Sequence, residues 1–144
     1  MYFPILRGRQ FELLALRECV KENVLSNQII PIVEPVKVSS TYIKTIDSFI
    51  EAEKPIAVIR NPQVGSWSKD LKKESNINIS AQFQKQFKAP CVISSFYVTP
   101  ELEKDIRIAI EKGDSIESML LLCNNPEYVD EYENVIGEKN LYIL

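Results

Sequence analysis

The stretch Ile29-Ile30-Pro31-Ile32-Val33-Glu34-Pro35-Val36-Lys37 decides the fold. Its apolar run, residues 29–33, lacks the alternation of a strand with one wet face, so we expect a strand buried on both faces, as in a parallel sheet. The proline inside the run is unusual for a central strand, because proline has no backbone N–H to donate to the neighbouring strand. The run then ends abruptly in a carboxylate, a proline and a lysine.

The same pattern of an apolar run, one or two polar residues and a helical periodicity recurs along the chain. It predicts strands over residues 2–6, 29–33, 55–59, 90–94, 118–123 and 141–144. Helical spacing and capping residues predict helices over 10–24, from 39–41 to about 53, over 80–88, from 99–101 to 113, and from 125–127 to 137. Residues 63–78 are less regular and predict an inserted loop that could hold a short helix.

Strands that alternate with helices imply parallel strands joined by crossover connections, hence an α/β fold with a parallel sheet. Two architectures fit this pattern. An open doubly wound sheet suits a chain of 144 residues. A partial TIM barrel has the same repeat, although a whole barrel takes ~250 residues. The last predicted strand has no helix after it, which favours the partial barrel, as a single domain over residues 1–144 truncated after the sixth strand.

The composition excludes several classes of function. The formal net charge is −3, so we expect no broad basic field and no nucleic-acid partner. The chain has no histidine and three widely spaced cysteines, which excludes the common zinc sites and histidine-based catalysis, and we assign no metal and no cofactor. Isolated cysteines on apolar segments predict reduced core residues in a cytoplasmic protein. No apolar run approaches ~20 residues, so we expect no membrane partner.

Three motifs carry a resemblance to a known family. They are residues 2–12 (YFPILRGRQFE), residues 30–37 (IPIVEPVK) and Arg60-Asn61-Pro62. Together and in this order they resemble the bacterial and phage "beta protein" family. The resemblance implies repeated βα units, a chain that corresponds to the N-terminal half of a longer member, and a role linked to phage defence. It implies no reaction.

Polar side chains follow the predicted strands, and in parallel sheets ligands bind at the carboxyl ends of the strands. We therefore treat these residues as a candidate ligand-binding set: Arg7, Arg9, Glu34, Lys37, Arg60, Asn61, Ser95 and Asn124. Arginine forks and amides suit a phosphate or carboxylate ligand. The structural alternative is that polar residues stand there because the chain reaches the surface. No catalytic residue is assigned.

Two residues carry sharper hypotheses. We expect Glu34 to contact Arg60, either as a structural ion pair or around a ligand. Trp67, the only tryptophan, is expected to cap the core under the inserted loop, with a stacking contact to a partner as the alternative.

Two functions follow from the sequence. The first is a non-catalytic interaction or scaffold module, because unpaired strand edges favour a protein partner or self-association. The alternative is a domain that binds or hydrolyses an anionic, nucleotide-like small molecule at the strand ends. Whether the chain is an enzyme stays open at this stage.

Overall fold

The computed structural model describes residues 1–114, 119–130, 133 and 142–143. One parallel sheet runs through it, with strands in the order in which they occur along the chain. The strands are β1 (Ile5–Arg7), β2 (Ile32–Glu34), β3 (Ile56–Ile59), β4 (Val92–Tyr97), β5 (Leu120–Leu122) and β6 (Tyr142–Ile143). The helices are α1 (Gln10–Lys21), α2 (Ser40–Glu51), α3 (Trp67–Asp70), α4 (Ile77–Gln86) and α5 (Leu102–Glu111), with the 3₁₀ turns η1 (Glu74–Asn76) and η3 (Pro126–Tyr128). The predicted α/β fold with a parallel sheet is confirmed.

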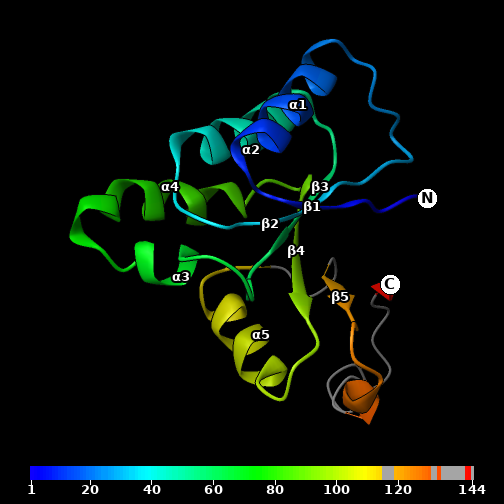
Figure 1. Ribbon diagram of the computed structural model, residues 1–144, viewed down its shortest axis with the longest axis vertical. Coiled ribbons are helices and arrows are strands. Elements are labelled where there is room, and N and C mark those ends of the chain that lie inside the picture. Colours follow the sequence, from blue (N-terminus) through cyan, green and yellow to red (C-terminus); the bar gives the residue numbers. More distant parts are fainter. Residues whose placement is uncertain (115–118, 131–132, 134–141, 144) are drawn as a thin grey trace.

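The sheet is singly wound. Its strand order contains no reversal, whereas a doubly wound sheet reverses its order and carries helices on both faces. Figure 1 shows α1, α2, α4 and α5 following one another around one side of the strands. This is the winding of the βα units of a barrel, so the strand order agrees with the barrel-like alternative and not with the doubly wound one.

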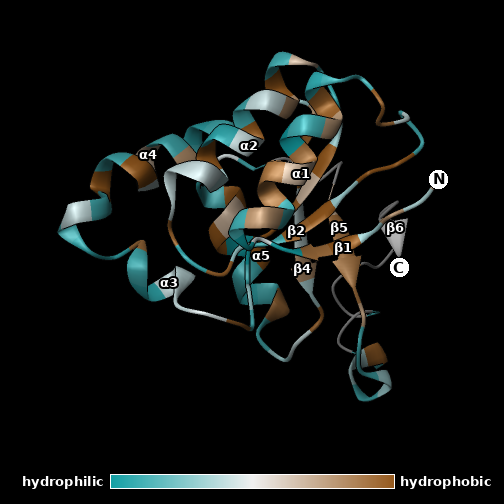
Figure 2. Ribbon diagram, turned by 45° about the horizontal axis from the view of Figure 1, so that its top comes forward, coloured by the Kyte–Doolittle hydropathy of each residue, from teal (hydrophilic) through white to brown (hydrophobic). Residues whose placement is uncertain are grey.

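The face of the sheet that carries the helices, called here the outer face, holds most of the core. Val33, Val58 and Val92 pack there against apolar residues of α1, α2 and α4, and Phe96 and Leu121 pack against α5. The helices turn their polar sides to solvent, and the strands are the most apolar part of the fold (Figure 2). The amphipathic pattern of the sequence therefore reports correctly which helix faces are buried.

The opposite, inner face of the sheet is also buried, and no helix of the described residues contributes to its apolar cluster. Its apolar cluster includes Ile32, Ala57, Ile59 and Leu122, and all of its members lie on strands or on the segments next to them. The described part of this inner cluster is therefore built by the strands and the segments that flank them.

Local chemistry explains where several elements begin and end. Pro31 stands directly before β2, and its carbonyl accepts a hydrogen bond from the Ala57 N–H at 2.8 Å. Because Pro31 lies outside the strand, the backbone N–H that proline lacks removes no hydrogen bond from β2 itself. The predicted N-cap of α2 is confirmed, because Ser39 Oγ accepts from the Tyr42 N–H at 3.2 Å. Gly113 follows α5 with φ = +99°, the left-handed conformation expected after a helix end.

Some boundaries differ from the prediction. Strand β4 continues to Tyr97, beyond the predicted residue 94, because the small polar pair Ser94-Ser95 lies within the strand and not at its end. Helix α5 begins at Leu102, and the predicted cap Thr99 accepts from the Leu102 N–H through its backbone carbonyl. The predicted helix that starts at Asn125 begins as η3, and its continuation falls largely outside the described residues, as do parts of the last two predicted strands.

The inserted segment after β3 is more ordered than a loop and carries α3 and η1 before α4. None of the helices in the described part of the chain has the length and apolar character that a membrane crossing needs.

Candidate functional site

The parallel strands place their carboxyl ends at one edge of the sheet, but the side chains there point to two different faces. Val33 lies opposite Val58 in the register of β2 and β3, so Glu34 is level with Ile59 and faces inward. Arg60 is one residue further along and therefore faces outward. The candidate residues split into an inner and an outer group.

The inner group centres on Glu34, whose exposed fraction is only 4%. Its Oε1 accepts a hydrogen bond from the Gln63 backbone N–H at 2.9 Å, and its Oε2 accepts one from the Tyr97 hydroxyl at 3.2 Å. Tyr97 reaches Glu34 from β4 across β3, a distance of about two strand spacings, or ~9.6 Å. Burial, together with the neighbouring Glu34 charge, raises the pKa of Tyr97 to about 12. The carboxylate is therefore satisfied by groups of its own chain.

Asn61 holds the end of β4 in position. Its Oδ1 accepts from the Tyr97 backbone N–H at 2.8 Å, while its Nδ2 donates to the Tyr97 carbonyl at 3.0 Å and to Asp105 Oδ2 at 3.1 Å. Burial raises the pKa of Asp105, and the Asn61 hydrogen bond opposes that rise. This paired backbone contact orients the strand from which Tyr97 reaches Glu34.

The outer group centres on Arg60, whose side chain is 8% exposed. Its Nε lies 3.1 Å from Asp114 Oδ2, and its Nη2 donates to Asp114 Oδ1 and to Gln84 Oε1, both at 3.3 Å. The guanidinium carbon stands 3.9 Å from the centre of the Phe87 ring. Burial lowers the pKa of Arg60, and the Asp114 charge opposes this shift. Ser94 donates a further hydrogen bond to Asp114.

The predicted contact between Glu34 and Arg60 is therefore wrong. The two residues share an edge of the sheet, but Glu34 bonds Tyr97 and Gln63 on the inner face, while Arg60 pairs with Asp114 on the outer face. The physical reason is the two-residue period of a strand, since a shift of one position reverses the direction of a side chain.

The remaining candidates do not gather into one cluster. Arg7 is exposed and lies in register with Glu34 on the neighbouring strand, and Ser95 is fully buried, with no hydrogen-bond partner for its Oγ among the described residues. Arg9 is the exposed N-cap residue of α1. Lys37 and Asn124 are exposed in the segments that follow β2 and β5.

Sequence reasoning missed Tyr97, Gln84 and Asp114. Tyr97 lies two residues beyond Ser95, so it faces the same way, and extending the fourth strand to residue 97 would have found it. Asp114 is 54 positions from Arg60 and follows the end of a helix, where no local pattern marks it as a partner. Trp67 is a core residue, as expected, and packs against Tyr42 and Phe83.

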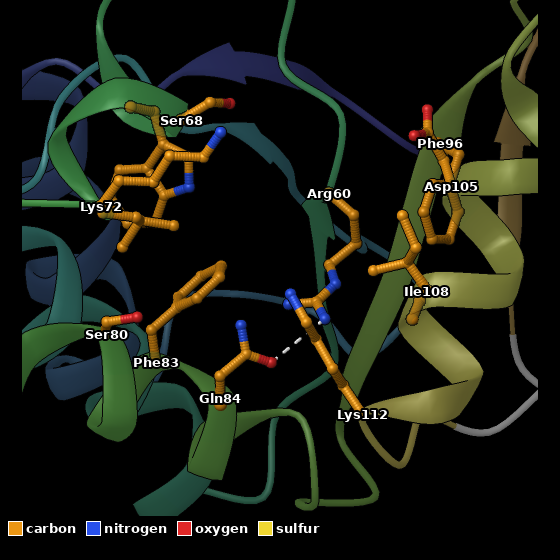
Figure 3. Close-up of a pocket in the computed structure, with 13 residues that line it drawn as sticks. Arg60, Ser68, Lys72, Ser80, Phe83, Gln84, Phe96, Asp105, Ile108 and Lys112 are labelled. Carbon is orange, nitrogen blue, oxygen red and sulfur yellow. Dashed lines mark hydrogen bonds between the residues drawn. The ribbon is translucent and has the colours of Figure 1, made fainter. Parts of the chain in front are cut away.

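An open cleft lies between α4 and α5 on the outer face, with a volume of about 290 Å³. We call it the α4–α5 cleft. Arg60 is at its floor, and Figure 3 shows that its guanidinium lies between the side chains of α4 and those of α5. The other lining residues are Trp67, Ser68, Leu71, Lys72, Ser80, Phe83, Gln84, Phe96, Asp105, Ile108, Ala109 and Lys112.

Comparisons of the chain with models of protein families, with curated proteins and with solved structures found no match. The resemblance to the beta protein family therefore stays a prediction. Within the described residues, no group of three histidine, cysteine, aspartate or glutamate side chains is placed to hold a metal ion.

Proposed function

We propose that this chain is a non-catalytic interaction module that binds an extended, partly acidic segment of a protein partner along the free edge of β1. The observation that carries the proposal is the composition of this edge. Ile5, the first residue of β1, is 55% exposed although it is a large apolar residue. A strand that adds to this edge would cover it.

Within the described residues, the backbone of β1 pairs with a strand on one side only, that of β2. The Pro4 carbonyl accepts from the Ile32 N–H at 2.8 Å, and the Gly8 N–H donates to the Glu34 carbonyl at 2.7 Å. The backbone groups of Pro4 and Gly8 therefore face β2. Because successive residues of a strand direct their N–H and C=O groups to opposite sides, Ile5 turns its own N–H and C=O to the free side. Such an edge is a template for main-chain pairing.

Apolar exposure is concentrated in the same part of the chain. Of the ten exposed large hydrophobic residues in the described regions, four lie within the first eleven positions: Met1, Tyr2, Ile5 and Phe11. Alternate side chains of an added strand could pack on such residues, and that contact would supply affinity that a three-residue ladder lacks.

Charge indicates the chemistry of the partner. Arg7 ends β1 and Arg9 follows it; both are exposed, and neither forms an ion pair within the described regions. A partner segment with apolar residues followed by carboxylates would complement this edge in both respects. A scaffold or subunit in a defence assembly, the role that the family resemblance implies, would use an edge of this kind.

The alternative of hydrolytic chemistry around Glu34 has less support. Both carboxylate oxygens of Glu34 already accept hydrogen bonds from the chain, and Tyr97 and Gln63 supply them. A carboxylate engaged in this way is suited to holding the strand ends together.

The test uses two dye-labelled peptides, each with alternating valine and threonine followed by a short run of either glutamates or lysines. We expect the glutamate peptide to bind and the lysine peptide to bind at least about tenfold more weakly. Ile5→Lys places a charge in the edge and should abolish binding of the glutamate peptide. The matched control is Ile77→Lys, the same change at a residue that is 61% exposed and lies on α4.

Fluorescence anisotropy measures both affinities, and sedimentation velocity on the peptide-free protein measures self-association. Equal affinity of the two variants, or no binding of either peptide at millimolar concentration, would contradict the proposal. A dimer that is lost in Ile5→Lys but kept in Ile77→Lys would identify a second copy of the chain as the occupant of the edge instead.

A further inference from the structure

The α4–α5 cleft arises from a gap in the helical layer. Helix α1 packs on α2 and α2 packs on α4, but α4 and α5 make no comparable contact. The cleft fills the space between them, with α3 at one end. Its volume of about 290 Å³ is close to the lower limit of ligand sites, ~300 Å³.

Arg60 keeps part of its hydrogen-bonding capacity free on the floor of this cleft. Its Nε and Nη2 are engaged by Asp114 and Gln84, whereas no partner within the described regions engages Nη1. Nη1 is not buried either, so it is open to the cleft that Arg60 lines. The side chain itself is held rigidly by the ion pair and by the Phe87 ring. It is therefore a fixed donor rather than a mobile surface cation.

Two lysines stand at the rim of the cleft. Lys72 comes from the segment after α3 and Lys112 from the end of α5, and Figure 3 shows the Lys112 side chain extending over the Arg60 guanidinium. Both are exposed, and neither forms an ion pair in the part of the chain that the structure describes. Arg60, Lys72 and Lys112 outnumber the nearby carboxylates of Asp105 and Asp114, so the cleft is locally positive in a chain of net charge −3.

Apolar side chains form about half of the cleft wall. Leu71 and Ile108 lie on opposite sides, with Phe83 and Ala109 deeper. An inorganic anion would leave these walls in contact with water, whereas an anion that carries a compact apolar body would cover them and gain their burial.

We propose that the α4–α5 cleft binds a small organic anion, a phosphate or carboxylate attached to a compact apolar group. Lys72, Lys112 and Arg60 Nη1 receive the anionic group, and Leu71 and Ile108 receive the apolar part. This site is separate from the β1 edge and does not depend on it, so either proposal can fail without the other.

Phenyl phosphate and benzoate are suitable probes, with inorganic phosphate and benzylamine as comparisons. Trp67 lines the cleft and is the only tryptophan of the chain, so its fluorescence reports binding directly. We expect a saturable change with phenyl phosphate or benzoate, a weaker response to inorganic phosphate and none to benzylamine. Calorimetry gives the dissociation constants independently of the fluorescence.

The decisive variant combines Lys72→Gln with Lys112→Gln, and it should weaken binding of the organic anion at least about tenfold. Its matched control combines Lys69→Gln with Lys104→Gln, which removes the same charge from exposed lysines outside the cleft. Arg60 is left unchanged, because its buried ion pair also supports the fold. Equal weakening in both variants, binding of benzylamine with similar affinity, or no binding of either organic anion at millimolar concentration would overturn the proposal.

Discussion

Glu34 is a buried carboxylate at the end of β2 that accepts two hydrogen bonds. Both donors lie in segments that follow Glu34 in the chain. The Gln63 N–H and the Tyr97 hydroxyl tie the loop after β3 and the end of β4 to β2. A buried carboxylate is costly unless such donors satisfy it. At the scale of the residue, Glu34 therefore joins three consecutive βα units.

The first prediction tests this role. Glu34→Gln replaces a double acceptor by an amide whose NH₂ group must face one of the two donors, so we expect it to lower the free energy of unfolding by roughly 1–3 kcal/mol. Denaturant titration measures the change. Glu51→Gln is the control, because Glu51 is exposed at the end of α2, and it should change stability by less than about 0.5 kcal/mol. Equal effects in the two variants would show that the network contributes nothing.

At the scale of the element, the segment before α3 depends on a close approach of two backbones. The N–H groups of Ser66 and Trp67 both donate to the Val36 carbonyl, at 2.8 and 3.1 Å. Gly65 adopts φ = +75° beside it, and a Cβ at this position would lie 2.1 Å from that same oxygen. Only glycine permits the approach that sets Trp67 into the core and beside the cleft.

The second prediction concerns this contact. Gly65→Ala should destabilise the protein clearly more than Gly113→Ala and should alter the Trp67 emission. The control Gly113 also has a positive φ, +99°, but an added Cβ would meet nothing within 4 Å. Gly113→Ala should thus cost only the conformational strain, about 1–2 kcal/mol. Thermal melts and tryptophan fluorescence compare the two variants, and similar losses would argue against a steric role for Gly65.

At the scale of the whole molecule, two buried tyrosines make the free energy of unfolding depend on pH in the alkaline range. The pKa of Tyr97 is raised to about 12, and burial raises the pKa of Tyr42 further still. In the unfolded chain both would ionise near pH 10. The unfolded state therefore loses protons at a pH where the folded state keeps them, and deprotonation favours unfolding.

The third prediction follows from this sign. The tyrosine contribution to the free energy of unfolding should be constant below about pH 10 and should be lost as the pH rises from about 10 to 12 and beyond. Urea titrations across this range measure it. Tyr97→Phe should reduce the slope, whereas Tyr2→Phe should not, because Tyr2 is 65% exposed. A slope that is the same in both variants would contradict the assignment to Tyr97.

The sequence alone determined the features that depend on near neighbours. The βα repeat, the parallel sheet, the cap at Ser39, the helix end at Gly113 and the burial of Trp67 all follow from periodicity, capping and hydrophobicity within a few residues.

Only the tertiary structure decided the order of the strands, the side to which each strand end turns its polar residue, and the partners that it finds there. Glu34 and Arg60 stand at comparable places in their own segments, yet the register of β2 with β3 sets them on opposite faces. Arg60 then meets Asp114 and Glu34 meets Tyr97, 54 and 63 positions away. Register between strands is a non-local property, and a shift of one residue reverses every side chain.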